Sequence, residues 1–188
     1  LPLITGVSEV RSVRTILQNV MRELDSKEIP YDKDILLGVM IETPAACMLA
    51  DILAKEADFF SIGTNDLTQY TIAVDRGNEN VAYLYSAFHP AVLRSVKRII
   101  ECAKRENIEV GMCGEAAGNP AMIPLLLAFG LDEFSVTASK VLETRKNIAS
   151  WTMKEAAAVT DTVMGMSTEK EVSAYLSDYI ATKMSNGK

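Results

Sequence analysis

Chemically capable side chains follow three predicted strands, at the point where each strand ends. Glu42 closes the first of these strands, and Cys113 closes the third. Asn65 and Asp66 follow the second. The carboxyl ends of parallel strands meet at one edge of a sheet or barrel, where the active sites of α/β folds lie. We therefore expect two carboxylates, an amide and a thiol around one opening.

The two carboxylates predict a magnesium site. Glu42 alone reads as a solvated strand end or a favourable charge at a helix start, and Asp66 alone as a loop or cap residue. Together they suit Mg²⁺, which takes one or two protein carboxylates and completes its shell with water and substrate phosphate. Zinc or copper would require His or Cys near this pair.

The loop after the second strand has the composition of a phosphate-binding loop. Gly63 lets the backbone approach a ligand, and Asn65 can donate to a phosphate oxygen. Simple turn chemistry is the alternative, although the apolar run 70–74 pins the loop into the fold. Arg76 is the cation expected at the opening, because its guanidinium fork fits phosphate or carboxylate, whereas alone it reads as a surface arginine.

The three cysteines have different predicted roles. A cysteine in a strand is most often a packed, inert thiol. Cys113 stands at a strand's carboxyl end beside Gly114, which favours access and a role in proton transfer. Cys47 and Cys102 fall within predicted helices and are expected to pack there, and His89, just before a helix, is expected to be structural.

Composition excludes several classes of protein. The chain has 188 residues, 48% of them hydrophobic, and a net charge of -6, which is typical of a soluble globular domain and argues against nucleic-acid or anionic-membrane surfaces. Its apolar stretches fall short of the roughly 20 residues of a membrane span, and no signal peptide is recognisable. The spaced cysteines indicate no disulfide framework, so a cytoplasmic location fits best.

The chain begins inside a predicted strand and without Met, so we expect it to be part of a longer protein.

Strands alternate with helices along the chain. We predict strands at 36–41, 58–62, 108–112 and 133–136 after a strand tail at 1–4, and helices at 8–28, 44–55, 90–105, 120–129 and from 139 onward. Ser8 is the expected cap of the first helix, and Gly165 separates the last two. This order predicts a parallel α/β sheet, either a doubly wound open sheet or half of a TIM (β/α)₈ barrel. The start of the chain within a strand and the polar residues at the carboxyl ends of the strands favour the second half of a barrel. Residues 1–188 would then form one partial domain.

Three segments resemble the motifs of the phosphoenolpyruvate-utilising enzymes. Residues 58–76 (DFFSIGTNDLTQYTIAVDR) resemble the family signature, and 39–46 and 111–115 resemble its two other motifs, in the family's order. Residues 70–78 are closer to the enzyme I group, the phosphoenolpyruvate-protein phosphotransferases of the bacterial sugar phosphotransferase system, than to pyruvate phosphate dikinases or phosphoenolpyruvate synthases. The resemblance covers essentially the whole chain, as the last half of that group's C-terminal barrel.

The resemblance implies a role for each candidate site residue. Glu42 and Asp66 would be Mg²⁺ ligands. Asn65 and Arg76, with Asp66, would bind phosphoenolpyruvate, and Cys113 would protonate the enolate carbon to give pyruvate. In phosphoryl transfer the protein mainly positions groups and stabilises charge, which agrees with these residue types.

The resemblance also implies partners that this chain does not contact by itself. The family enzyme passes the phosphoryl group to a histidine on a separate N-terminal domain and then to HPr, and its barrel forms a homodimer. That domain and the earlier barrel strands with their arginines are absent from these residues, and His89 lies in no acceptor motif. We therefore expect the chain alone to bind phosphoenolpyruvate weakly and to be inactive, with no nucleic-acid binding and no membrane insertion.

Three alternatives stay open. A dikinase or synthase of the same family would couple the same half-reaction to a nucleotide domain. A non-catalytic dimerisation module would use the apolar helices after Ser139. A Mg²⁺-dependent lyase or aldolase on a similar barrel would share the Glu and Asp ligands without needing Cys113.

Overall fold

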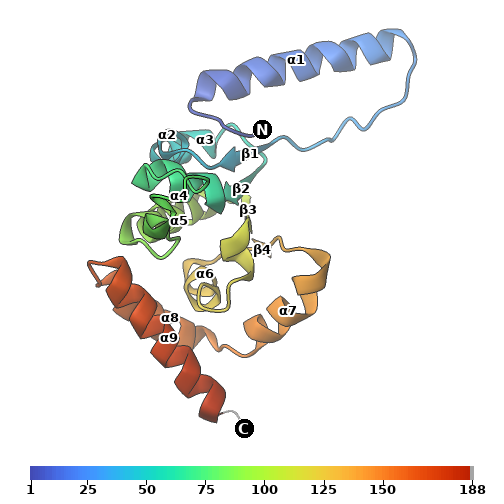
Figure 1. The fold of residues 1–188 in the computed structure, drawn as a ribbon. Coiled ribbons are helices and arrows are strands. Elements are labelled where there is room, and N and C mark those ends of the chain that lie inside the picture. Colours follow the sequence, from blue (N-terminus) through green and yellow to red (C-terminus); the bar gives the residue numbers. More distant parts are fainter. Residues whose placement is uncertain (187–188) are drawn as a thin grey trace.

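The chain forms a parallel sheet whose strands follow one another in sequence order. The computed structural model describes residues 1–186, with side chains described up to Lys183. Its described strands are β1 (Gly38–Ile41), β2 (Phe59–Gly63), β3 (Glu109–Cys113) and β4 (Glu133–Phe134), in the order β1-β2-β3-β4. Every neighbouring pair is parallel, and helices lie in each crossover (Figure 1). This confirms the predicted parallel α/β class.

Helices precede, connect and follow the strands. The α-helices are α1 (Val7–Ser26), α2 (Pro44–Met48), α3 (Ala50–Leu53), α4 (Thr64–Ile72), α5 (Pro90–Arg105), α6 (Ile123–Phe129), α7 (Val141–Ala149), α8 (Met153–Met164) and α9 (Glu169–Asn186). Short 3₁₀ turns are η1 (Ala82–Leu84), η2 (Glu115–Gly118) and η3 (Ala138–Lys140). Among the described residues, no helix combines the length and the apolar character needed to cross a bilayer.

One face of the sheet is packed into the core. Alternate side chains of β1, β2 and β3 are almost completely buried: Val39, Ile41, Phe60, Ile62, Val110 and Met112. They join one hydrophobic cluster with the apolar stripe of α5, including Val96, Ile99 and Ile100. Because successive side chains of a strand point to opposite faces, the residues between them face the other way.

The other face of the sheet is open. The paired row Met40, Ser61, Gly111 and Glu133 crosses this face. Met40 and Ser61 are half-buried, and Glu133 is exposed. Parallel sheets are normally covered on both faces, and in a (β/α)₈ barrel the second face is the packed interior. Helices on one side and an open inner face agree with half a barrel rather than a doubly wound sheet.

The first residues pair with β1 as a further strand would. The Leu1 nitrogen donates to the Gly38 carbonyl at 2.7 Å, and the Met40 N–H donates to the Leu1 carbonyl at 2.8 Å. This alternation is the parallel ladder pattern. It supports the expected strand tail at the start of the chain.

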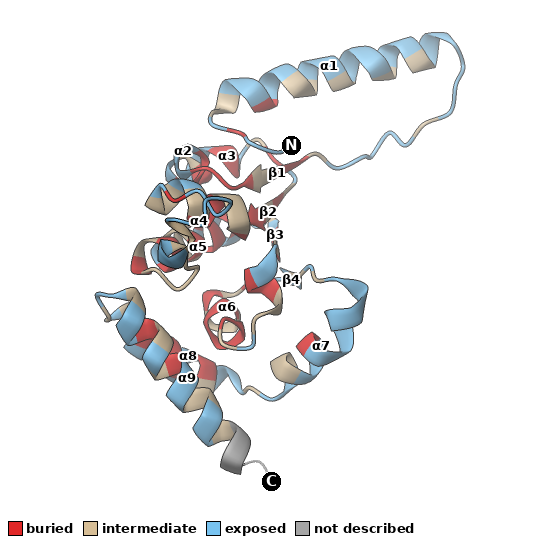
Figure 2. Cartoon of the chain, viewed as in Figure 1, coloured by how far each residue is buried: buried red, intermediate tan, exposed pale blue. Residues whose placement is uncertain are grey.

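Helix α1 stands away from the rest of the molecule (Figure 1). Val10 is buried, whereas Ile16 and Val20 are exposed, and most of the helix surface is open to solvent (Figure 2). The prediction that Ser8 caps this helix was wrong. The cap is Gly6, whose N–H donates at 2.7 Å to the carboxylate of Glu9 in the first turn.

Other departures from the predicted elements have local causes. The segment after β2, expected as a long polar loop, begins with helix α4, because Gly63 serves as its cap and Asp66 lies in its first turn, where the helix dipole favours an anion. The single helix expected after Pro44 is divided at Leu49 into α2 and α3. Strand β4 is shorter than expected.

The chain is helical after residue 139, as predicted, and these helices bury apolar side chains. Helix α8 buries Ala156, Val159 and Val163, and α8 packs against α6. Val172 and Leu176 of α9 are also buried, while Trp151 and Ile180 are half-buried. Gly165 ends α8, as expected.

Candidate functional site

The ends of β1 and β2 meet closely at the carboxyl edge of the sheet. Ile41 pairs with Ile62, so Glu42 lies beside Gly63. A Cβ atom built on Gly63 would lie 2.5 Å from Glu42 Oε2 and 2.8 Å from Glu42 Cβ. These separations are shorter than real contacts allow, so only glycine leaves room for the Glu42 side chain here.

Glu42 is buried and held by the start of the chain. Only 4% of the Glu42 surface is exposed to solvent. Its Oε1 accepts a hydrogen bond from the Leu3 N–H at 2.7 Å, and Leu3 adopts the left-handed conformation with φ 50. A buried carboxylate needs such donors, because burial without a partner is costly. The bond to Leu3 uses Oε1, which leaves Oε2 on the Gly63 side.

Helix α4 brings Asp66 and Arg76 together. Asp66 lies in its first turn, and the helix ends at Ala73 in the left-handed conformation. The chain then turns back, and the Arg76 N–H donates to Gln69 Oε1 at 3.1 Å. The Arg76 guanidinium lies 3.8 Å from Asp66 Oδ1, and both side chains are partly exposed. The turn that follows α4 thus brings Arg76 back beside the first turn of that helix.

Cys113 lies half-buried at the end of β3. Its Sγ accepts from the Ser61 hydroxyl at 3.8 Å and donates to the Ile62 carbonyl at 3.6 Å. Its carbonyl accepts from Thr64 Oγ1 at 2.9 Å, which ties β3 to the start of α4. Gly114 follows with φ 93, and a Cβ there would lie 2.5 Å from Thr64 Oγ1. The close approach of α4 and β3 therefore depends on this glycine.

The other cysteines and His89 have the predicted structural roles. Cys47 and Cys102 are 4% and 0% exposed, and burial raises the pKa of the Cys47 thiol. His89 caps α5, with its Nδ1 accepting from the Ala91 N–H at 3.2 Å.

A pocket of about 280 Å³ lies next to the carboxyl edge of the sheet. Its lining residues are Asn65, Arg76, Ala82, Tyr85 and Glu115. It exceeds the roughly 30 Å³ that one water takes in the liquid, so it has room for a small ligand. Asn65 Oδ1 accepts from the Glu115 N–H at 3.4 Å, and the Tyr85 hydroxyl donates to the Asn65 carbonyl at 3.0 Å.

The structure thus joins two of the predicted residues in the pocket and leaves three around it. Among the described lining residues, Asn65 and Arg76 are present and Glu42, Asp66 and Cys113 are not. Asp66 contacts the lining residue Arg76, and the Cys113 carbonyl accepts from Thr64, the residue before Asn65. Glu42 stands beside Gly63, immediately before α4.

Sequence reasoning missed three lining residues, Ala82, Tyr85 and Glu115, of which the last two are polar. Glu115 belongs to the motif 111–115 but was not assigned a role. Tyr85 lies in the irregular segment between η1 and α5, outside every motif, and its contact with Asn65 is a tertiary one between residues 20 positions apart. Nothing in the local sequence pattern signals that contact.

Glu42 and Asp66 have the right chemistry for Mg²⁺ but form no complete cage. Within the part of the chain that the structure describes, no three His, Cys, Asp or Glu side chains cluster in a way that could hold a metal. Mg²⁺ does not require such a cluster, since one or two carboxylates with water and phosphate oxygens suffice. Two carboxylates that follow neighbouring strands fit that pattern by donor type.

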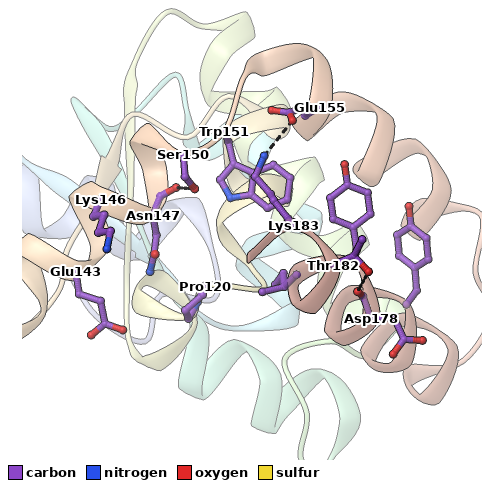
Figure 3. A pocket seen from close by; sticks show the side chains of 13 residues that line it. Pro120, Glu143, Lys146, Asn147, Ser150, Trp151, Glu155, Asp178, Thr182 and Lys183 are labelled. Carbon is purple, nitrogen blue, oxygen red and sulfur yellow. Dashed lines mark hydrogen bonds and ion pairs between the residues drawn. The ribbon is translucent and has the colours of Figure 1, made fainter. Parts of the chain in front are cut away.

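Another, larger pocket of about 1170 Å³ is lined mainly by residues of α7, α9 and the link before α8 (Figure 3). Trp151 stacks on Tyr179 with ring centroids 5.8 Å apart. Lys183 Nζ lies 4.4 Å from the Trp151 ring and 3.0 Å from Glu155 Oε1. None of the predicted site residues is among its described lining, and these contacts attach α9 to the start of α8.

Known proteins resemble this chain over nearly its whole length. Residues 1–153 match the family model described as PEP-utilising enzyme, PEP-binding domain. The phosphoenolpyruvate-protein phosphotransferase of Geobacillus stearothermophilus is 46% identical over 175 residues, which cover 93% of this chain and 30% of the relative. The protein of the same name from Priestia megaterium is 45% identical over 171 residues, covering 91% and 30%.

A relative from Staphylococcus aureus, also called phosphoenolpyruvate-protein phosphotransferase, is 42% identical over 179 residues, which cover 95% of this chain and 31% of the relative. The chain thus spans about three tenths of the length of these relatives. The resemblance expected from the motifs is confirmed. The chain belongs to the family of PEP-utilising enzymes, in which it matches the PEP-binding domain.

Proposed function

We propose that this chain is the C-terminal, PEP-binding part of a phosphoenolpyruvate-protein phosphotransferase. The whole enzyme would transfer the phosphoryl group of phosphoenolpyruvate to a histidine of its own N-terminal domain and then to HPr, releasing pyruvate, during bacterial sugar uptake. The observation that carries the proposal is the pocket lined by Asn65 and Arg76 in a chain of this family.

Arg76 and Asn65 supply the groups that hold the substrate. The guanidinium of Arg76 offers a planar fork for a phosphate or carboxylate, and the Asn65 amide can donate to a second oxygen. Asp66, 3.8 Å from Arg76, orients the guanidinium and keeps it from leaving the pocket side of α4. Positioning and charge stabilisation of this kind supply most of the catalysis in phosphoryl transfer.

Glu42 and Asp66 would hold Mg²⁺ at the strand ends. The ion would supply positive charge for the phosphoryl and enolate oxygens. Burial of Glu42 beneath the first residues of the chain keeps its carboxylate fixed before any ligand binds.

Cys113 is proposed as the proton donor. Breaking the C–O–P linkage of phosphoenolpyruvate at the phosphorus leaves the enolate of pyruvate, whose terminal carbon must gain one proton. The S–H of Cys113 gives that proton and becomes a thiolate, and the Ser61 hydroxyl 3.8 Å away can donate to that charged sulfur. A new C–H bond forms as the S–H bond breaks.

Residues 1–188 would then be a partial barrel domain. The open face of the sheet and the exposed apolar residues of α1 support a missing complementary half, which would also carry further substrate-binding arginines. The whole protein would act in the cytoplasm as a homodimer joined through its barrel domains. By itself the chain would bind phosphoenolpyruvate weakly and turn nothing over.

The proposal is tested by pyruvate formation in the full-length protein. Cys113→Ala should abolish pyruvate release in a coupled assay and leave dimerisation intact, whereas Cys47→Ala, which removes a buried thiol in α2, should retain at least half of the activity. Unchanged turnover of Cys113→Ala would favour a non-catalytic module. Tight binding of phosphoenolpyruvate with Mg²⁺ to residues 1–188 in calorimetry would contradict the half-site expectation.

A further inference from the structure

Tyr85 lines the candidate pocket but belongs to none of the three sequence motifs. Its hydroxyl donates to the Asn65 carbonyl at 3.0 Å, across 20 residues of sequence. Its side chain lines the pocket beside Arg76 and Glu115. The Tyr85 side chain therefore contacts the first turn of α4 through Asn65 and lies in the same pocket as the Arg76 guanidinium.

The segment that carries Tyr85 needs such an anchor. Residues 77–80 are exposed and irregular, and the 3₁₀ turn η1 buries none of its residues. Arg76, at the start of this segment, is held by Gln69 through its backbone and by Asp66 through its side chain. The hydroxyl of Tyr85 fixes the far end of the segment to the same helix, so both ends are tied to α4.

The phenol remains a donor under physiological conditions. Burial raises the pKa of Tyr85, while Thr68 and the positive charge of Arg76 oppose that rise and Glu115 adds to it. The hydroxyl therefore stays protonated near neutral pH and keeps its hydrogen bond to Asn65.

We propose that Tyr85 is a positioning residue for substrate binding: its hydroxyl, by anchoring the segment after Arg76 to the first turn of α4, holds Asn65 and Arg76 at the spacing that receives phosphoenolpyruvate. This rests on the proposed function. Tyr85 acts through those two residues and donates no proton to the reacting atoms.

The test compares Tyr85→Phe with Tyr83→Phe in the full-length phosphotransferase. Tyr83 is 81% exposed and lies two residues away, so it is a matched control for loss of a hydroxyl. Tyr85→Phe should raise KM for phosphoenolpyruvate about 3- to 10-fold with kcat within about twofold, the size expected from loss of one hydrogen bond that acts equally on ground and transition states. Tyr83→Phe should change neither constant.

A purely structural role predicts a different result. Fewer folded molecules would lower the apparent kcat and leave KM unchanged, since KM does not depend on the concentration of active enzyme. Unchanged KM in Tyr85→Phe overturns the proposal even if that variant is less stable. Partial trypsin digestion adds a readout without turnover: cleavage after Arg76 should be several-fold faster in Tyr85→Phe, and equal rates contradict the anchoring. If the wild-type enzyme forms no pyruvate while digestion distinguishes the variants, the proposed function fails and the anchoring stands.

Discussion

At the scale of single residues, the contact between Gly63 and Glu42 depends on the absence of a side chain. A methyl group at position 63 would lie 2.5 Å from Glu42 Oε2 and 2.8 Å from Glu42 Cβ, so the backbone must shift to admit it. The candidate metal ligand and the start of α4 are therefore coupled through one glycine.

We expect Gly63→Ala to lower the free energy of unfolding by about 1–3 kcal/mol, the usual range for overpacking. Urea denaturation of residues 1–188 measures this. Gly165→Ala is the control, because its new Cβ would make an ordinary contact at 3.4 Å, and its stability should change by no more than about 0.5 kcal/mol. Equal stability of the two variants would mean that Glu42 does not pack against Gly63.

The cysteines should differ in reactivity. Iodoacetamide should alkylate Cys113 in the native chain at least tenfold faster than Cys47 or Cys102, because Cys113 is half-buried while the others are 4% and 0% exposed. Mass spectrometry of peptides from timed samples measures the three rates. In urea all three should react at similar rates, and comparable native rates would show that Cys113 is closed to reagents.

At the scale of elements, the start of α8 depends on one acidic side chain. Glu155 accepts from the Thr152 N–H at 2.9 Å and from its hydroxyl at 2.8 Å, and it pairs with Lys183 of α9. The hydrogen bond from the Thr152 backbone, followed by those from Lys183 and the Thr152 hydroxyl, lowers the pKa of Glu155 from 4.5 to about 2.

This lowered pKa sets a pH window for stability. A carboxyl that ionises more easily in the folded chain stabilises it fully above the unfolded pKa of about 4.5, and that contribution is lost as pH falls through about 2. Glu155→Gln keeps a capping amide but removes the charge. It should be less stable than the wild type at pH 7, with the difference shrinking between pH 4.5 and pH 2.

Urea unfolding at several pH values tests the window. Asp161→Asn, on the exposed side of α8, is the control and should not reduce the stability at pH 7. A stability difference for Glu155→Gln that is constant from pH 7 to pH 2 would contradict the role of the charge.

The sequence predicted the helices and strands well where the spacing of apolar residues agrees with the Pro and Gly residues that begin or end an element. The bounds of α5, Pro90–Arg105, follow from Pro90 and a regular apolar stripe, and each strand end was located to within two residues. Helix α4 was missed because Gly-Thr-Asn-Asp serves equally as a turn or as a helix start. The isolation of α1 was also not predictable, because an amphipathic pattern shows that a helix has an apolar face but not whether a partner is present.

The candidate site was predictable in outline and not in detail. Residues at the strand ends follow from the parallel fold, and the structure brings their elements together as expected. Tyr85 could not be predicted, because its role depends on where an irregular segment returns in space. The magnesium ligands and the proton donor stay predictions.

At the scale of the whole molecule, the open sheet face should make the isolated chain associate. Met40 and Phe59 lie half-buried on that face, and Ile16 and Val20 of α1 are exposed. Uncovered apolar surface of this kind favours self-association. We expect sedimentation to show an average mass of residues 1–188 that rises with concentration.

Charge substitutions locate the surface responsible. Met40→Lys on the open face should reduce association, whereas Met48→Lys in α2, where the side chain is already 66% exposed, should not. A monomer at all concentrations, or equal effects of the two substitutions, would show that the open face is not the associating surface.

The packing of α8 on α6 has a consequence for where this unit ends. The match to the family model stops at residue 153, where α8 begins, yet α8 buries Val159 and Val163 in the same hydrophobic cluster as the sheet. A polypeptide trimmed to residues 1–153 would expose the surface of α6 against which α8 packs. The end of the family model and the end of the packed interior therefore fall at different places in this chain.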